Sequence, residues 1–178
     1  MKKHKKKSNL MYRIMSFWMS FRAVTLKPMQ ILQEIGLKDG QKILDYGAGP
    51  GVFTIPAAQL VGSSGEVIAV DIHPMSKKII DQKAKHKKIS NVTTILANIN
   101  TGLRDQQMDV VLLFDVLHLV EEKSRLMKEL HRLLKTGGKL FIKPDHLSIE
   151  NLKTLIKSDG MFIHQQDFGE ILKFQKIG

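Results

Sequence analysis

A glycine-rich segment preceded by an acid is the first feature of this sequence that could do chemistry. Asp45 stands two residues before Gly47, and Gly49 and Gly51 follow at alternate positions. Glycine tolerates positive φ and lets a ligand approach the main chain, and a helix that begins after such a turn points its N-terminus at the ligand. The dinucleotide fingerprint needs a further glycine where this chain has Val52. Because a carboxylate repels phosphate and attracts an ammonium or a sulfonium, Asp45 indicates a site for a cationic ligand.

A second acid, Asp71, follows an apolar run at 67–70 and lies twenty residues after Gly51. A carboxylate at the end of the second strand of such a unit accepts hydrogen bonds from the hydroxyls of a ribose. Aspartate is also a good helix N-cap, so capping of the next helix is the alternative for this residue taken alone. Together with Asp45 and the glycines, ribose binding is the favoured interpretation.

The elements that must position these residues alternate along the chain. Pro28 suits the first turn of a helix that stops near Gly36. Further helices are expected at 52–61, 75–88, 121–134 (ending at the Gly137-Gly138 pair) and 148–158, and strands at 42–46, 67–70, 92–95, 109–114, 139–142, 162–166 and 171–176. Apolar strands separated by amphipathic helices indicate an α/β fold with a parallel sheet covered on both faces. Ligands bind such a sheet at the carboxyl ends of its strands, where the strand order reverses.

Composition restricts the remaining possibilities. A chain of 178 residues is expected to form one domain. The absence of cysteine excludes disulfides, Cys-ligated zinc, iron–sulfur clusters and thiolate nucleophiles, and it fits a reducing, cytoplasmic location. No grouping of histidines and acids has metal-ligand spacing, so no metal is expected. The formal charge is +11, and eight basic residues precede the first acid, Glu34.

Residues 1–27 are expected to form a basic tail followed by an amphipathic helix. The large apolar side chains recur at spacings of three and four: Leu10, Ile14, Phe17, Trp18 and Phe21. The longest uncharged stretch, 14–21, is much shorter than the roughly 18–20 residues that span a bilayer. Packing on the core, a lid over a substrate pocket and an interfacial helix in peripheral contact with a membrane all remain open for this segment.

Four motifs follow one another along the chain: LDYGAGPG at 44–51, AVDIHP at 69–74, FDVLHLV at 114–120 and LLKTGGKLFI at 133–142. In this order they resemble the motifs of class I S-adenosylmethionine (SAM)-dependent methyltransferases, in particular the ubiquinone and menaquinone biosynthesis group. The resemblance covers residues 28–178, which it identifies as the methyltransferase domain. It implies a Rossmann-like three-layer sandwich whose seven-stranded, mostly parallel sheet has an antiparallel last strand, with SAM as the cofactor.

The resemblance also implies which residues bind the cofactor: Asp45, Gly47, Ala48, Gly49, Gly51, Asp71, Ile72, Asn98, Ile99, Phe114 and Asp115. The methionine moiety would lie near the glycine-rich turn, the ribose on Asp71, and the adenine beside Ile72 and Ile99. Asn98 stands where the family usually has an acid that binds the adenine amino group, and its amide oxygen can still accept that hydrogen bond. Phe114 and Asp115 would meet the methyl-transfer centre.

Methyl transfer from a sulfonium is an in-line displacement, for which the protein mainly supplies alignment and a water-poor pocket. If the acceptor must lose a proton, His118 is the candidate catalytic base; a packed, hydrogen-bonded histidine at the start of a helix is the alternative. No large inserted substrate domain is present, so the favoured acceptor is a small, rather apolar molecule. Residues 8–30, a partner protein or the second copy of a homodimer would complete the pocket.

Two other functions remain open. The chain could be an RNA methyltransferase that holds phosphates with its Lys-rich tail and the lysines of 77–88, in which case binding would weaken steeply with salt. It could also be a non-catalytic binding module with a SAM-type fold, an interpretation toward which the unusual Asn98 points.

Overall fold

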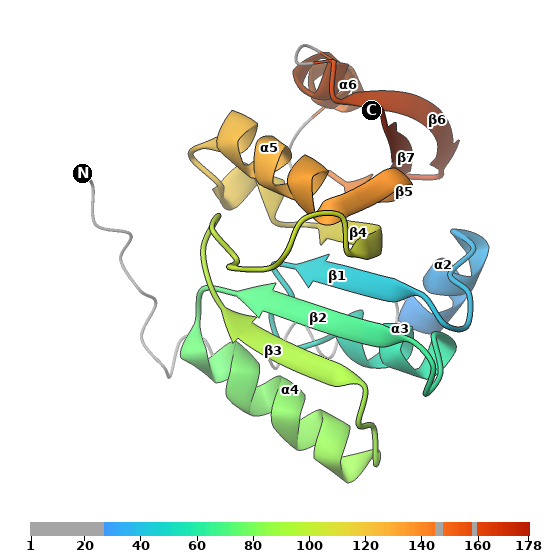
Figure 1. Ribbon diagram of the computed structural model, residues 1–178, viewed down its shortest axis with the longest axis vertical. Helices are drawn as coiled ribbons and strands as arrows, with labels where there is room; N and C mark the ends of the chain where they lie inside the picture. Colours follow the sequence, from blue (N-terminus) through green and yellow to red (C-terminus); the bar gives the residue numbers. More distant parts are fainter. Residues whose placement is uncertain (1–26, 145–147, 158–159) are drawn as a thin grey trace.

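The computed structural model describes residues 27–144, 148–157 and 160–178. The predicted amphipathic helix at the N-terminus lies outside these residues, and so do its possible roles as a lid or an interfacial helix. The described part of the chain forms a single sheet with helices on both sides (Figure 1).

Seven strands make up the sheet in the described residues. They are β1 (Lys42–Tyr46), β2 (Glu66–Asp71), β3 (Val92–Leu96), β4 (Met108–Phe114), β5 (Leu134–Lys143), β6 (Phe162–Phe168) and β7 (Ile171–Lys176). Their order is β3-β2-β1-β4-β5-β7-β6, and β7 runs antiparallel to β5 and β6. The predicted seven-stranded, mostly parallel sheet with an antiparallel last strand is therefore confirmed. The order reverses between β1 and β4, so the ligand crevice is expected at the carboxyl ends of these two strands.

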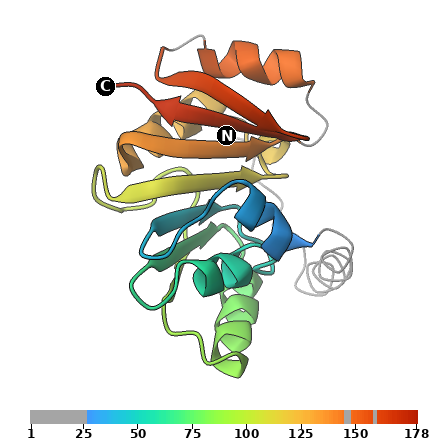
Figure 2. The same cartoon turned by 90° about the vertical axis from the view of Figure 1, so that its right-hand side faces the viewer.

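Helices cover both faces of this sheet. On one face lie α2 (Pro28–Glu34), α3 (Thr54–Leu60) and α4 (Pro74–His86), and on the other lie α5 (Lys123–Leu133) and α6 (Ile149–Lys157). Figure 2 shows α2 and α3 in front of the sheet. Within the described ranges, no helix combines the length and the hydrophobicity that a membrane crossing requires. The arrangement is the predicted three-layer sandwich.

Residues 110–114 of strand β4 show why an uninterrupted apolar sequence occupies the centre of the sheet. Val110, Leu112 and Phe114 pack in the cluster beneath α2 and α3. Val111 and Leu113 point to the opposite face and pack in the cluster beneath α5 and α6. Because successive side chains of a strand point to opposite faces, a strand with a helical layer on each side needs apolar residues at every position.

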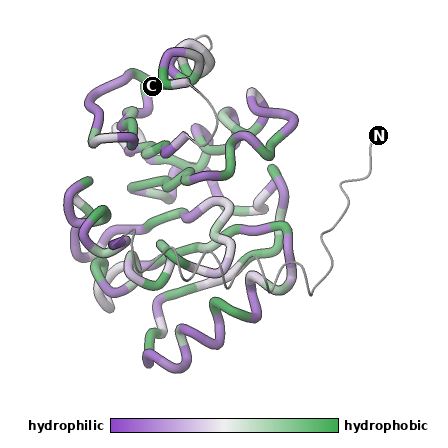
Figure 3. Tube along the Cα trace, turned by 180° about the vertical axis from the view of Figure 1, so that it is seen from behind, coloured by the Kyte–Doolittle hydropathy of each residue, from purple (hydrophilic) through white to green (hydrophobic). Residues whose placement is uncertain are grey.

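Helix α4 is the predicted Lys-rich helix. Its inner side buries Ser76, Ile80 and Ala84, and the lysines at 77, 78 and 85 are exposed. Hydrophilic and hydrophobic residues accordingly alternate along this helix in Figure 3. Lys83 is the exception, since it is only partly exposed and lies near the glycine-rich turn.

The boundary between α5 and β5 differs from the prediction. The helix ends at Leu133 and the strand starts at Leu134, so the prediction that the helix runs on to Gly137-Gly138 is wrong. Leu134 is fully buried, has an extended backbone and pairs with Met108 of β4. Because of this long-range pairing, the strand starts before Gly137-Gly138.

Candidate functional site

The turn after β1 is built on glycines with left-handed backbone angles. Gly47, Gly49 and Gly51 have φ values of 78°, 53° and 75°. The N–H groups of Gly47 and Ala48 both donate to the carbonyl oxygen of Val70 in β2, at 2.8 and 3.0 Å. The turn therefore folds over the carboxyl end of the neighbouring strand, where the sequence predicts the ligand.

Close packing is a second reason why two of these positions require glycine. A Cβ atom on Gly47 would lie 2.6 Å from Cγ2 of Val116, and one on Gly51 would lie 2.8 Å from Cγ1 of Ile80. Real Cβ atoms do not approach other atoms so closely. The neighbours of the turn, Val116 from the segment after β4 and Ile80 from α4, could not be read from the local pattern.

Asp45 lies buried at the penultimate position of β1, with 4% of its surface exposed. Its Oδ2 accepts a hydrogen bond of 2.5 Å from the hydroxyl of Thr54, the first residue of α3. Burial raises the pKa of Asp45 to about 6; the Thr54 hydrogen bond opposes this rise, and the charge of Asp71 adds to it. A cationic ligand beside this carboxylate would stabilise its ionised form.

Asp71, the last residue of β2, is tied to the glycine-rich turn. Its Oδ2 accepts a hydrogen bond from the N–H of Gly49, and its Oδ1 accepts one from the N–H of His73, each at 2.8 Å. Burial raises the pKa of Asp71, and these two hydrogen bonds oppose the rise. A carboxylate offers about four acceptor positions, so Asp71 retains the capacity to bind two hydroxyl groups.

The capping alternative for Asp71 is wrong. The N-cap of α4 is His73, whose Nδ1 accepts a hydrogen bond of 3.2 Å from the N–H of Met75. Asp71 lies two residues before this cap. Its side chain is directed to backbone groups of the turn and of the connection to α4.

Helix α4 also fastens the turn from outside, through contacts that the sequence analysis missed. The hydroxyl of Ser76 donates to the carbonyl oxygen of Gly49, and Nζ of Lys83 donates to that of Pro50 at 2.7 Å. Burial lowers the pKa of Lys83. Ser76, Ile80 and Lys83 follow the spacing i, i+4, i+7 of one helix face, which is the signal that could have separated Lys83 from the solvated lysines.

The residues expected around the adenine differ in how much of their surface is exposed. Ile72 is 56% exposed at the end of β2, and Leu96, which pairs with Asp71 across β2 and β3, is also exposed. Asn98 is exposed, whereas Ile99 is buried in the hydrophobic cluster beneath α5. The exposed apolar surface that could contact a base therefore comes from Ile72 and Leu96, and the sequence analysis did not include Leu96.

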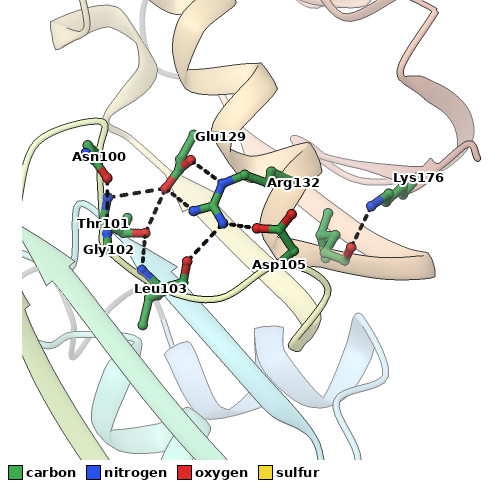
Figure 4. A network of polar contacts seen from close by, with 9 residues as sticks. Asn100, Thr101, Gly102, Leu103, Asp105, Glu129, Arg132 and Lys176 are labelled. Atoms are coloured by element: carbon green, nitrogen blue, oxygen red, sulfur yellow. Dashed lines mark hydrogen bonds and ion pairs between the residues drawn. The ribbon is translucent and has the colours of Figure 1, made fainter.

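Residues 97–107, which connect β3 to β4, contain no helix and are held by side chains of α5 (Figure 4). The guanidinium of Arg132 donates to both carboxylate oxygens of Glu129 at 2.8 Å and to the carbonyl oxygen of Leu103 at 2.9 Å, and it also pairs with Asp105. Glu129 in turn accepts from the N–H and the hydroxyl of Thr101 at 3.2 and 2.8 Å. This network fixes the loop that carries Asn98 and Ile99.

A hollow of about 360 Å³ lies beside this network. It is lined by Ile99, Asn100, Arg125, Lys128, Glu129 and Arg132. No residue of the glycine-rich turn or of the ends of β1, β2 and β4 takes part in it. The hollow is therefore separate from the glycine-rich turn at which the sequence predicts the ligand.

The segment after β4 completes the described site. Phe114 is buried and its ring meets that of Phe53 edge to face, with centroids 4.8 Å apart. Asp115 adopts a left-handed backbone with φ 54°, and its Oδ1 lies 2.9 Å from Nζ of Lys143. His118 is half-buried in a 3-10 turn, η1 (Leu117–Leu119), which precedes α5. Lys143 belongs to β5, and nothing in the local sequence singles it out.

These features fit a nucleoside that carries a sulfonium or ammonium group. Asp45 is a buried carboxylate that can attract a cation, Asp71 has acceptor positions that can bind a diol, and Ile72 has exposed apolar surface on which a base can pack. Within the described residues, no group of three or more His, Asp and Glu side chains is arranged to hold a metal ion.

Comparisons with known proteins bear on this interpretation. A family described as a methyltransferase domain matches residues 37–176. The ubiquinone/menaquinone biosynthesis C-methyltransferase UbiE of Shewanella sp. (strain W3-18-1) is 33% identical over 141 residues, which are 76% of this chain and 56% of the relative. The chain thus spans little more than half the length of the curated relatives it matches.

Solved structures share the fold. A SAM-dependent methyltransferase from Aquifex aeolicus superposes with a TM-score of 0.73 at 23% identity, covering 84% of this chain and 88% of that one. A putative SAM-dependent methyltransferase from Methanococcus maripaludis gives a TM-score of 0.80 at 16% identity, covering 94% and 92%. The family match over residues 37–176 agrees with the ordered motifs of the sequence, and the chain therefore belongs to the methyltransferase domain family.

Proposed function

We propose that this protein is a class I methyltransferase that uses SAM to methylate a small, rather apolar acceptor. The observation that carries the proposal is the joining of two acids by one turn: Asp45 lies buried beneath the glycines, and Asp71 holds Gly49 through its side chain. The first suits a cation and the second a ribose. The family match supports the reaction type.

When bound, SAM would supply an electrophilic methyl group: an electron pair of the acceptor would form the new bond as the carbon–sulfur bond breaks, and sulfur would keep the electrons of the broken bond as the neutral thioether of S-adenosylhomocysteine (SAH). The chain's own part is to hold and orient. Asp45 would stabilise positive charge in the crevice, Asp71 would fix the ribose, and Asn98 would accept a hydrogen bond from the adenine amino group. The buried ring pair of Phe53 and Phe114 would exclude water from the end of β4.

His118 is the proposed base for an acceptor that loses a proton during transfer. It lies three residues after Asp115, in the turn that follows β4, and is half-buried. An imidazole can take a proton near neutral pH. An acceptor that is already deprotonated, or that loses its proton later to solvent, would not need it.

A small apolar acceptor is supported by the surface next to the site. Leu119, in the same turn as His118, is 61% exposed. Residues 8–26, which the structure does not describe, or a second copy of the chain could cover this surface, and so could a peripheral membrane contact. The name of the UbiE relatives makes precursors of ubiquinone and menaquinone the first acceptors to test.

An RNA acceptor receives less support from the described residues. Of the six lysines between 77 and 88, Lys77 pairs with Asp81 at 3.0 Å and Lys83 is hydrogen-bonded to Pro50. Two members of the cluster are therefore engaged within the chain. The tail remains a route to phosphate binding, which makes RNA an outcome for the same experiment to detect.

The test is transfer of labelled methyl from SAM to a panel of quinone precursors, small phenols, small amines and total RNA, at low and high salt. The expected result is labelling of one small-molecule class with turnover that is insensitive to salt. Labelling of RNA alone, lost as salt rises, would replace the acceptor in our proposal. If no acceptor is labelled while Asp45→Ala still binds a partner protein, the non-catalytic alternative is the better account.

A further inference from the structure

Lys143 is the last residue of β5 and lies at the carboxyl edge of the sheet, where it pairs with Phe114 of β4. Its Nζ is 2.9 Å from Oδ1 of Asp115 and 3.8 Å from Oε2 of Glu170. The Lys143 side chain is only 17% exposed. Of its two partners, the side chain of Asp115 is 32% exposed and that of Glu170 is 81% exposed. Water screens an ion pair less as it becomes more buried, so Asp115 is the principal partner of this ammonium.

Asp115 is held by Lys143 at two points. Its backbone N–H donates to the carbonyl oxygen of Lys143 at 3.1 Å, and its carboxylate binds the ammonium of the same residue. Between these two contacts the backbone of Asp115 takes a left-handed conformation, with φ 54°. Few residues other than glycine adopt it, and aspartate and asparagine are among those that tolerate it best. The conformation at this position directs the chain that follows.

The next residue, Val116, lies against the glycine-rich turn. Its Cβ and both of its methyl carbons would lie 2.6 to 2.9 Å from a Cβ on Gly47, so its side chain fills the space that glycine leaves. The N–H of Gly47 and that of Ala48 are bound to Val70. A continuous series of contacts thus runs from Lys143 through Asp115 and Val116 to the turn.

We infer that Lys143 is a positioning residue of the methyl-transfer site: by pairing with Asp115 it holds the segment after β4 against the glycine-rich turn and keeps the turn in its binding conformation. The inference concerns the site of the proposed function and rests on that proposal for its role in methyl transfer. The series of contacts itself is a property of the ligand-free chain.

The same two strands provide a matched control at their other end. Lys135 of β5 pairs with Asp109 of β4, with Nζ and Oδ1 2.6 Å apart. Like the pair of Lys143 and Asp115, this pair joins a lysine of β5 to an aspartate of the β4 region. It differs in lying near the amino ends of the two parallel strands, and its lysine side chain is 46% exposed. Lys135→Met removes an ion pair between the strands without touching the turn.

The experiment compares Lys143→Met, Lys143→Arg, Asp115→Asn, the Lys143→Met/Asp115→Asn double variant and Lys135→Met. Amide hydrogen exchange of Gly47 and Ala48 is measured in the ligand-free chain, and SAH affinity is measured by calorimetry. We expect Lys143→Met to speed exchange at both amides and to weaken SAH binding, each by about tenfold, and the double variant to be no worse than the worse single variant. Lys143→Arg should restore both quantities to within about twofold, since it keeps the charge. Lys135→Met should change neither.

The inference is overturned if Gly47 and Ala48 exchange at wild-type rates in Lys143→Met, or if Lys135→Met speeds them equally. Should Lys143→Met fail to fold, the exchange rates of ligand-free Asp115→Asn make the same comparison, because asparagine keeps the shape and tolerates the left-handed backbone. The SAH affinity of Asp115→Asn is not used for this purpose, since Asp115 is itself an expected contact of the cofactor. If the wild-type chain does not bind SAH, the proposed function fails, while the exchange rates still decide the role of Lys143. If SAH binds and the variants exchange and bind as the wild type does, only the inference about Lys143 fails.

Discussion

The N–H of Gly49 donates a hydrogen bond of 2.8 Å to the carboxylate of Asp71, and this contact joins the turn after β1 to the end of β2. Asp71 also raises the pKa of Asp45 through its charge, so the two acids act on one another across the same turn. A ligand that brings a positive charge to Asp45 and a diol to Asp71 would relieve this repulsion and use both groups. In the proposed function, the two acids are therefore in place before SAM binds.

Binding of SAM is expected to weaken as the pH falls through about 6. Burial raises the pKa of Asp45 to about 6, so the carboxylate that attracts the cation is largely protonated at pH 5. We expect the dissociation constant of SAM to rise about tenfold between pH 7.5 and pH 5, since one pH unit below a pKa leaves about a tenth of the group ionised. Calorimetry at both pH values measures this, with Asp45→Asn as the control whose pH dependence is flat or much reduced. An affinity of the wild-type chain that does not change with pH would contradict the role given to Asp45.

The ligand-free Asp45→Asn variant is expected to be more stable than the wild type at pH 7.5. The folded pKa lies above the unfolded value of 3.8, so the folded chain binds more protons and its stability falls as the pH rises from about 4 to about 6. Asparagine keeps an oxygen for the Thr54 hydroxyl and removes the buried charge. We expect a gain of roughly 1–3 kcal/mol in the free energy of unfolding at pH 7.5, and a smaller gain at pH 4. Urea titrations at the two pH values measure this gain. A loss of stability in Asp45→Asn at pH 7.5 would contradict the claim that the buried charge of Asp45 destabilises the folded chain.

Gly47→Ala is expected to destabilise the chain because Val116 occupies the space a Cβ needs. Gly102 is a matched control, since its φ of 71° is close to the 78° of Gly47 and no atom lies within 4 Å of the added Cβ. Both variants carry the strain of a left-handed alanine, roughly 1–2 kcal/mol, and Gly47→Ala carries a further 1–3 kcal/mol of overpacking. Adding Val116→Ala should recover part of this second cost. Equal unfolding free energies for Gly47→Ala and Gly102→Ala would show that the contact with Val116 is unimportant.

Arg132→Met is expected to loosen the connection between β3 and β4. The arginine side chain is 33% exposed and binds Glu129, Asp105 and the carbonyl of Leu103, so its loss should cost about 1–2 kcal/mol after allowance for solvent screening. Arg125→Met, which removes an exposed pair with Glu122, should cost less than about 0.5 kcal/mol. Urea denaturation compares the two variants. Similar losses in both would mean that the network does not hold the loop.

The sequence was sufficient for the order of the helices and strands because amphipathic helices alternate with short apolar strands, whereas the antiparallel last strand was implied by the resemblance to class I methyltransferases. All seven expected strands occur, and the turn that joins Asp45 to α3 stands where its glycines predict. Boundaries set by distant contacts could not be predicted in the same way: β5 starts at Leu134 because Met108 pairs with it.

The candidate site was predictable only where local chemistry marks it. Asp45, Asp71 and the glycines carry a recognisable spacing. Val116 and Ser76 contact the turn from other elements, and Lys143 contacts Asp115, the residue before Val116. Ordinary lysine, valine and serine residues give no local signal of such contacts. Ile99 is buried in the hydrophobic cluster beneath α5, and its contact with a base stays a prediction.

The central claim is tested most directly by calorimetric titration of the full chain with SAM, SAH and NAD, in the wild type, in Asp71→Ala and in Asp39→Ala. Asp39 is exposed near the start of β1 and contacts Ser64, so its variant controls for the loss of a surface acid. The account predicts that SAM and SAH bind and NAD does not, that Asp71→Ala weakens SAH by at least about tenfold, and that Asp39→Ala stays within about twofold of the wild type. Tighter binding of NAD than of SAM, or unchanged SAH affinity in Asp71→Ala, would contradict it.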